Sequence, residues 1–380
     1  MKKFIYVIIF FSFFDLFTQL PVMSTYAESL GASAFLTGLA VGMYSLSNTF
    51  GNIISGFLTD RKGPFVILVI GLLTTGLSLT LYNLVAEPIT LLTVRFVHGL
   101  VAGFIVPAAF TFLANATEQE KRGKGSAISG AFVGIAAIIG PAFSGILASR
   151  TSVPFVFNIT ASFMLFLGIL ATFVLRSSKV TKENTAPSTY IPIRVFFKNA
   201  GTLKAFSGAF FLMFSQGVIA YLLPLKVQSL GFDSRLSGTL MSAFGIIAVL
   251  VFILPSNRIF DKVAPIKTLS LGISLMGISQ ILISQADSST LLYIAMICYG
   301  VGFGFLFPSV NSLLIDSTTV EVRGKAYGYF YAFFSLGVVL GSSLLGWLSL
   351  GIVSGFIFTG LVLIGFAVIT LIPKRKPSHR

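Results

Sequence analysis

Twelve apolar runs follow one another along this chain, and they limit its possible folds more than any other feature. Each run is about 20 residues long or longer, so a helix made from it would cross roughly 30 Å of hydrocarbon. Of the 380 residues, 55% are apolar and 10% are charged, and the mean hydropathy is +0.94. This composition excludes a water-soluble domain and predicts an all-α membrane protein. The twelve expected transmembrane helices are residues 4–25, 35–58, 64–85, 88–114, 124–149, 153–175, 205–227, 234–256, 266–285, 289–315, 324–349 and 351–373.

The second half of the chain repeats the first at an offset that places Asp60 on Asp261. The residues that match at this offset are glycines, prolines and charges, so shared apolar composition does not explain the repeat. Internal repeats of this size are typical of secondary transporters. We therefore expect two pseudo-symmetric bundles of six helices. The expected parts are a first bundle at 1–176, a cytoplasmic linker at 177–204, a second bundle at 205–373 and a basic cytoplasmic tail at 374–380.

The 26 lysines and arginines lie mostly on one side of the predicted topology. All but Arg95, Arg150, Lys226 and Arg235 fall at the termini or in the even-numbered connections, which the positive-inside rule places in the cytoplasm. The net charge of +14 is thus a topology signal with attraction to anionic lipid headgroups, and it does not indicate a nucleic-acid partner. We expect a multi-pass protein of the plasma membrane, in a bacterium the inner membrane, with both termini cytoplasmic.

Asp15 is the one acidic residue that the predicted spans place deep in the membrane. It shares a helical face with Ser12 and Gln19, and it lies on the order of 16 Å from the cytoplasmic end of its helix. An unpaired carboxylate at that depth is costly, so the side chain must be protonated, paired or facing a wet cavity. A structural carboxyl group bonded to a neighbouring helix is the alternative interpretation.

Arg95 and His98 lie three residues apart in the expected helix 88–114 and share one face. Arg95 is predicted about 9 Å below the outer surface, within reach of Asp15 for a long guanidinium side chain. We therefore expect Arg95 to be the partner of Asp15. His98 is either a group that titrates near neutral pH or a hydrogen-bonded packing residue.

Two further patterns combine glycines with charges or proline. Glycines in a charged hairpin allow close helix approach and a tight reversal at the membrane surface. Proline bends a helix, and small residues around it allow close packing, so a kinked packing seam is the alternative to a functional role. The hairpin residues are Gly56, Asp60, Arg61 and Gly63, with a partial copy in Asp261 and Lys262, and the proline-containing helix has Gly140, Pro141 and Gly145.

The second half lacks the buried charges of the first. At the repeat offset, Gln216 takes the place of Asp15 and Met296 that of Arg95. The glycine-rich run from Gly300 follows no strand and lies in an apolar helix, so it is no nucleotide-binding loop. With no metal-ligand or nucleophile pattern, we expect no cofactor, no metal and no enzymatic activity. The polar side chains expected to line a substrate cavity are Gln19, Tyr44, Gln216 and Tyr299.

These motifs together resemble those of the major facilitator superfamily, over essentially the whole chain. The hairpin at 56–63 is similar to the family's loop 2–3 signature, and residues 95–103 are similar to its fourth-helix signature, in which an arginine is associated with proton coupling. Residues 140–145 resemble the antiporter signature of the fifth helix, with Ser144 where a glycine is usual. The twelve-helix drug:proton antiporters are the most similar branch.

The resemblance implies two bundles that rock around a cavity lined by the first, fourth, seventh and tenth helices. It also implies that Asp60 braces the cytoplasmic gate near Gly324. Our leading hypothesis is proton-coupled export of a small amphiphilic compound by a monomer, with Asp15, Arg95 and His98 coupling transport to protons. The alternatives are import or uniport of a sugar, amino acid or other metabolite and, from other classes, a non-transporting receptor or an enzyme acting within the membrane.

Overall fold

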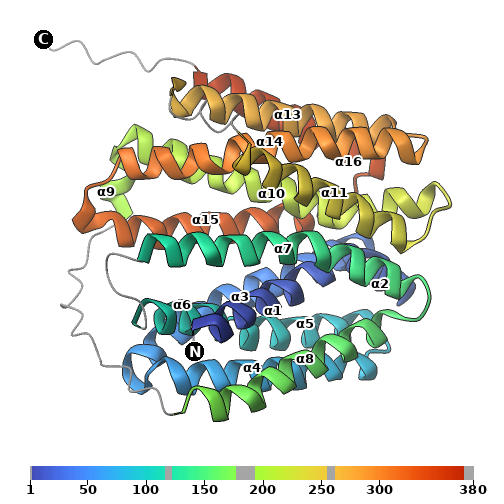
Figure 1. Cartoon of the computed structure of the whole chain (residues 1–380). Coiled ribbons are helices and arrows are strands. Elements are labelled where there is room, and N and C mark those ends of the chain that lie inside the picture. The colour runs from blue at the N-terminus through green and yellow to red at the C-terminus, as the bar shows by residue number, and fades with distance from the viewer. Residues whose placement is uncertain (1, 116–121, 177–192, 255–261, 372–380) are drawn as a thin grey trace, which may run out of the picture. The chain divides into compact units, whose positions relative to one another are not determined.

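The computed structural model describes every residue except 1, 116–121, 177–192, 255–261 and 372–380 (Figure 1). The described residues form helices, and this part of the chain contains no strand. A helix satisfies its backbone hydrogen bonds internally, which is the requirement that hydrocarbon surroundings impose. The predicted all-α class is therefore confirmed.

The first half of the chain follows the predicted spans, with one bend and one interruption. The first expected helix is two elements that meet at an angle of 46°, and the fourth is interrupted between Ala102 and Ile105. The third ends in a short 3₁₀ helix. The elements are α1 (Lys2–Gln19), α2 (Met23–Ser29), α3 (Ala34–Lys62), α4 (Pro64–Thr80), η1 (Leu81–Leu84), α5 (Pro88–Ala102), α6 (Ile105–Asn115), α7 (Arg122–Ala148) and α8 (Val153–Val174).

The second half also begins and ends its helices close to the predicted residues. Proline stands at the first position of α13, as it does in α4 and α5, where its missing N–H leaves no hydrogen bond unmade. A short helix, α9, precedes the first long one. The elements are α9 (Ile193–Lys198), α10 (Ala200–Ser229), α11 (Ser234–Ile253), α13 (Pro265–Gln285), α14 (Ser289–Asp316), α15 (Val320–Trp347) and α16 (Ile352–Leu371).

Ten helical segments in the described part of the chain are long and apolar enough to cross a membrane, or eleven if the bent pair α1 and α2 is one span. The remaining predicted span corresponds to α3, which has 29 residues and is long enough to cross. Polar side chains along α3, among them Ser45, Asn48 and Asn52, lower its hydropathy. The multi-pass character of the protein is confirmed.

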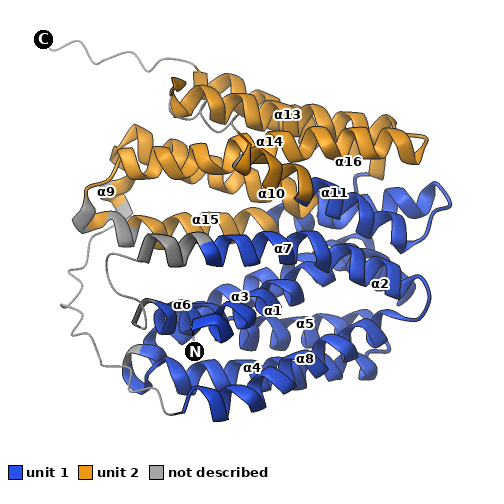
Figure 2. Cartoon of the chain, in the orientation of Figure 1, with its two compact units in different colours: residues 1–189, 219–245, 339–350 blue, residues 190–218, 246–338, 351–380 orange. Residues whose placement is uncertain are grey.

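The chain divides into two compact units (Figure 2). Unit 1 contains residues 1–189, 219–245 and 339–350, and unit 2 contains residues 190–218, 246–338 and 351–380. Helices α10, α11 and α15 contribute to both units. The predicted bundles at 1–176 and 205–373, like the linker at 177–204, follow from the sequence repeat and stay a prediction.

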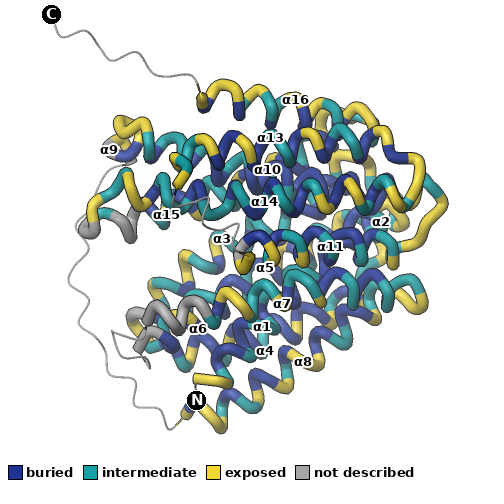
Figure 3. Tube along the Cα trace, turned by 45° about the horizontal axis from the view of Figure 1, so that its top comes forward, coloured by how far each residue is buried: buried dark blue, intermediate teal, exposed yellow. Residues whose placement is uncertain are grey.

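Unit 1 is built from pairs of packed helices. Helix α1 packs on α7, α3 packs on α5, and α4 packs on α8 and α6. Buried and exposed residues alternate along the helices (Figure 3), and many large apolar side chains, such as Phe57 and Phe173, are exposed. Exposed apolar side chains at this density are expected of helices that face lipid rather than water.

Small residues bring α7 and α11 into backbone contact within unit 1. A Cβ atom on Gly238 would lie 3.0 Å from the Cα atom of Gly145. The Ser234 hydroxyl donates to the carbonyl of Gly145 at 3.0 Å, and the Ser242 hydroxyl donates to that of Ile138 at 2.6 Å. Unit 2 is similar in kind: α13 packs on α14 and α16.

Candidate functional site

Asp15 lies in the body of unit 1, with 1% of its surface exposed. It is near the end of α1, where the apolar face of the helix packs against α7 and leaves the carboxyl group facing α3 and α5. Its Oδ2 atom is 3.1 Å from Nε2 of His98 and accepts from the Tyr44 hydroxyl at 3.5 Å. Gln19 Nε2 donates to Oδ1 at 3.5 Å and to the Asp15 carbonyl at 2.9 Å.

The pair of Asp15 and His98 is an ion pair whenever the imidazole is protonated. His98 is fully buried in α5, and its ring meets that of Tyr44 edge to face at 5.0 Å between centroids. The second ring nitrogen, Nδ1, is 3.2 Å from the hydroxyl oxygen of Tyr82. Each nitrogen of this imidazole therefore has one buried oxygen partner.

Arg95 is 3% exposed and turns toward α3. Its Nε donates to the carbonyl of Ala40 at 2.7 Å and Nη2 to that of Val41 at 3.0 Å. Nη1 donates to Oε1 of Gln19, and the guanidinium carbon lies 5.4 Å from the centroid of the Tyr44 ring. Each of the three guanidinium nitrogens thus donates a hydrogen bond, as a guanidinium held away from water requires.

The expectation that Arg95 is the direct partner of Asp15 is wrong. The carboxylate contacts His98, and Gln19 stands between it and the guanidinium by accepting from Arg95 and donating to Asp15. The prediction compared only depths along the membrane normal, and depth does not give the direction in which a side chain leaves its helix. The i, i+3 spacing of Arg95 and His98 was the correct signal that both belong to one site.

Two expected cavity residues, Gln19 and Tyr44, belong to this cluster and are buried, with 2% and 5% of their surfaces exposed. Sequence reasoning missed Tyr82, which η1 places against His98. A tyrosine at the end of an apolar run carries no pattern that distinguishes it from a packing residue. The buried polar residues that the structure brings together are Asp15, Gln19, Tyr44, Tyr82, Arg95 and His98, which we call the Asp15 cluster.

Unit 2 contains a corresponding cluster of uncharged groups. The Tyr299 hydroxyl donates to Oε1 of Gln216 at 2.9 Å and is 2.9 Å from the Ser215 hydroxyl. Gln280 Nε2 donates to the Ser215 hydroxyl at 2.7 Å, while its Oε1 atom is buried without a hydrogen-bond partner. We call these four residues the Gln216 cluster. It brings together the predicted cavity residues Gln216 and Tyr299.

The hairpin residues lie where α3 ends and α4 begins. Gly63 has a φ of +85°, a backbone conformation that favours glycine, and its N–H bonds to the carbonyl of Thr59. Arg61 and Lys262 are exposed. The side chain of Asp60, the surroundings of Gly324 and all of Asp261 lie outside the described part of the molecule, so the predicted contact between Asp60 and the region of Gly324 stays a prediction.

The predicted antiporter residues lie in α7, on two of its contacts. Gly140 faces α1, where an added Cβ would lie 2.9 Å from the Cβ of Phe17, and Gly145 faces α11. Pro141 lies within the helix, and the Ser144 hydroxyl donates to its carbonyl at 3.2 Å. These residues therefore allow α7 to pack closely on both neighbours.

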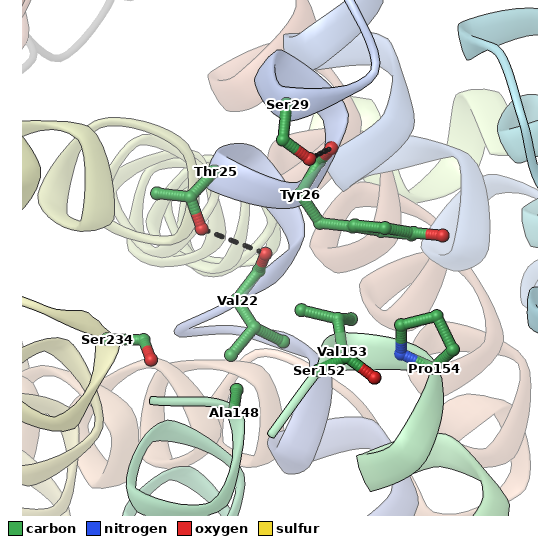
Figure 4. A pocket seen from close by; sticks show the side chains of 9 residues that line it. All are labelled: Val22, Thr25, Tyr26, Ser29, Ala148, Ser152, Val153, Pro154 and Ser234. Carbon is green, nitrogen blue, oxygen red and sulfur yellow. Dashed lines mark hydrogen bonds between the residues drawn. The ribbon is translucent and has the colours of Figure 1, made fainter. Parts of the chain in front are cut away.

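Unit 1 also has a surface pocket of about 350 Å³ (Figure 4). Its lining comes from α2, from the connection between α7 and α8, and from the start of α11. The hydroxyls of Thr25 and Ser29 bond to carbonyls of their own helix. The residues that line this pocket are Val22, Thr25, Tyr26, Ser29, Ala148, Ser152, Val153, Pro154 and Ser234.

The described residues contain no group of three or more His, Cys, Asp or Glu side chains that could hold a metal ion.

Comparison with known proteins identifies the family. A sequence model of the Major Facilitator Superfamily (MFS) matches residues 5–225 and again residues 205–380. The chain is 26% identical to an MFS-type transporter of Methanocaldococcus jannaschii over 92% of each chain. It is 27% identical to the multi-drug resistance efflux pump PmrA of Streptococcus pneumoniae, over 84% of this chain and 82% of that one. The crystal structure of a mutant of the nucleoside transporter NupG has the same fold, with a TM-score of 0.81 at 16% identity and 97% of both chains covered.

The chain belongs to the Major Facilitator Superfamily. It is a multi-pass membrane transporter with the two-bundle fold of that family, and it is not an enzyme. Its relatives include multidrug efflux pumps, and its substrate is a small molecule.

Proposed function

We propose that the protein exports a small amphiphilic compound in exchange for protons, and that the pair of Asp15 and His98 is the proton site. The observation that carries the proposal is a carboxyl group with 1% exposure held 3.1 Å from a fully buried imidazole on a separate helix. Groups of this kind within transmembrane segments are costly and are usually found on ion pathways.

The surroundings allow the pair to gain and lose a proton. The guanidinium of Arg95 supplies a fixed positive charge that balances an ionised Asp15, and Gln19 links the two groups. A proton on the pair and a cationic compound near it each add one positive charge to this balanced site, so the two repel each other. Binding of one therefore weakens binding of the other, which is the coupling that exchange requires.

The resemblance to efflux pumps supports export as the direction. PmrA is described as a multi-drug resistance efflux pump. A buried carboxylate such as that of Asp15 suits a ligand with a positive charge, and the aromatic ring of Tyr44, whose hydroxyl donates to this carboxylate, suits a ligand with apolar rings. In this proposal both termini are cytoplasmic and the protein acts as a monomer.

Proton release from the purified protein tests the proposal. Ethidium, a neutral dye and an anionic dye are added in turn to weakly buffered wild type, Asp15→Asn and the control Asp287→Asn, whose carboxylate is exposed. We expect the cation to release protons from wild type and from the control, and none from Asp15→Asn. Equal binding of a compound to all three proteins without proton movement would make Asp15 a structural carboxyl group and would favour uniport or import.

A further inference from the structure

Tyr82 has no role in the exchange proposed for Asp15 and His98, yet its hydroxyl reaches this pair. It lies in η1, where the chain leaves α4, and it is fully buried, while the next residues, Asn83 and Leu84, are exposed. The side chain therefore turns inward from an exposed segment. Its oxygen lies 3.2 Å from Nδ1 of His98, the ring nitrogen that Asp15 does not use.

The ring of Tyr82 and its hydroxyl have separate surroundings. The ring packs against Phe157, with centroids 4.3 Å apart, and meets the edge of the His98 ring at 5.8 Å. These contacts would be the same for phenylalanine. Packing accounts for an aromatic residue at this position, but it does not account for a hydroxyl group that is fully buried against an imidazole nitrogen.

We propose that Tyr82 is a positioning residue of the proton site: its hydroxyl donates to Nδ1 of His98 and so holds the Nε2 proton on the side of Asp15. The inference rests on the proposed function, in which Asp15 and His98 share the coupled proton. The nitrogen that carries the proton in a histidine is set by the hydrogen bond that the other nitrogen makes. Tyr82 is the group that makes that bond here.

Counting hydrogens shows which protonation state Tyr82 favours. With Asp15 ionised and His98 neutral, Nε2–H donates to Asp15 and Nδ1 accepts from Tyr82, so every donor has an acceptor. One more proton on the pair places a hydrogen on Nδ1 when His98 becomes an imidazolium, or when a protonated Oδ2 of Asp15 donates to Nε2. Tyr82 must then accept from Nδ1, and its own hydrogen loses the acceptor that it had.

The charged and titratable groups around the pair point the same way. Arg95 on α5 and Tyr44 on α3 face the pair, and Tyr26 on α2 and the Arg95 guanidinium interact electrostatically with Tyr82. A cation beside the hydroxyl oxygen favours that oxygen as an acceptor toward Arg95 and leaves its hydrogen for His98. The hydroxyl therefore favours the pair without the extra proton.

Removal of the hydroxyl should change the tautomer of His98 and the proton equilibrium of the pair. In Tyr82→Phe, Nδ1 lacks this partner in both protonation states: without the extra proton it is an unsatisfied acceptor, and with the proton it is an unsatisfied donor. Loss of one buried hydrogen bond corresponds to about a tenfold change in such an equilibrium, so the excess of the Nε2 tautomer should fall and the midpoint of proton uptake should move by about one pH unit or less. A residue that acted through packing alone would change the amount of folded protein and leave this midpoint where it is.

Nitrogen NMR of the histidines measures the tautomer and the midpoint directly. The chain has two histidines, His98 and His379, so His379→Gln leaves one labelled imidazole in the reconstituted protein. We expect the wild-type background to carry its proton on Nε2 above the midpoint, and Tyr82→Phe to mix the tautomers and shift the midpoint. The matched control is Tyr6→Phe in α1, which removes a hydroxyl from a ring that stacks on Phe132 at 5.8 Å, and it should leave both readouts unchanged.

An unchanged tautomer and midpoint in folded Tyr82→Phe would overturn the proposal. If that variant does not fold, the wild-type background still decides, because a neutral His98 with its proton on Nδ1 above the midpoint contradicts the proposed bond. Neither readout uses a transported compound. Failure of the positioning role is therefore distinguishable from failure of the proposed export, which substrate-dependent proton release tests separately.

Discussion

The Asp15 cluster and the Gln216 cluster occupy repeat-related positions and differ in what they can do with a proton. The repeat offset places Asp15 on Gln216 and His98 on Tyr299. Both pairs are bonded in the structure, at 3.1 Å between Nε2 and Oδ2 in the first half and 2.9 Å between the hydroxyl and Oε1 in the second. The same contact between two helices is thus built once from ionisable groups and once from neutral ones.

The difference extends to the surrounding positions. Arg95 corresponds to Met296, which is fully buried, so the second half has no cation to balance a carboxylate. Its polar groups instead come from Ser215 and Gln280, which share neutral hydrogen bonds. No group of the Gln216 cluster ionises at physiological pH, so the net charge of this cluster stays zero. Proton coupling is therefore expected of the first half, and neutral polar contacts with the transported compound of the second.

Asp15→Gln, which copies the second-half residue into the first, should have the largest effect. We expect ethidium transport driven by a pH gradient in everted vesicles to fall by about 100-fold or more, a size typical for removal of a proton-transfer group. Exchange of labelled for unlabelled ethidium at equal pH should persist, because it needs no net proton movement. Gln216→Ala is the matched control, and an equal loss in both variants would break the comparison.

Arg95→Met, the second-half residue at that position, should have a smaller effect that appears in stability. It removes the donor from Oε1 of Gln19 and from the carbonyls of Ala40 and Val41. Unsatisfied buried acceptors and an unbalanced Asp15 should together lower the free energy of unfolding by about 3 kcal/mol. The thermal midpoint of the detergent-solubilised protein measures this loss.

Arg95→Lys sharpens the same test, since it keeps the charge and loses the planar fork. We expect it to recover part of the stability, because the ammonium group still balances Asp15. If Arg95→Met is as stable as wild type, then the guanidinium does not hold α1, α3 and α5 together. Arg95 and Met296 would then contribute equally to the stability of their two halves.

Helix ends and buried faces were predictable because local chemistry decides them. Apolar runs gave the spans, and residues such as Pro64, Pro88 and Pro265 fix the first turn of a helix. The bend between α1 and α2 and the break between α5 and α6 were missed. Pro21 lies in the first break and Pro107 follows the second within one turn. A proline removes the bond from its own N–H to the carbonyl four residues earlier, so the local sequence contains a cause for each break that the prediction overlooked.

Most members of the Asp15 cluster were predictable from the sequence, and their pairing was not. Burial cost alone indicates that Asp15 and Arg95 are functional or paired. Which of Arg95 and His98 reaches Asp15 depends on the rotation of α5 about its own axis, and packing against α3 sets that rotation. Tyr82 could not be found at all, since its position depends on the turn of η1 beneath α5.

Tyr299→Phe should give the smallest effect and is the sharpest test of the neutral half. The variant keeps the ring and loses the bonds to Gln216 and Ser215. Loss of neutral hydrogen bonds costs about 1 kcal/mol, so the apparent affinity for ethidium should weaken by about fivefold. The pH at which transport is half-maximal should stay the same, because no ionisable group has changed its charge or partner. A shift of that pH as large as the one expected for Tyr82→Phe would show that the two clusters titrate together, and the division of roles between the halves would be wrong.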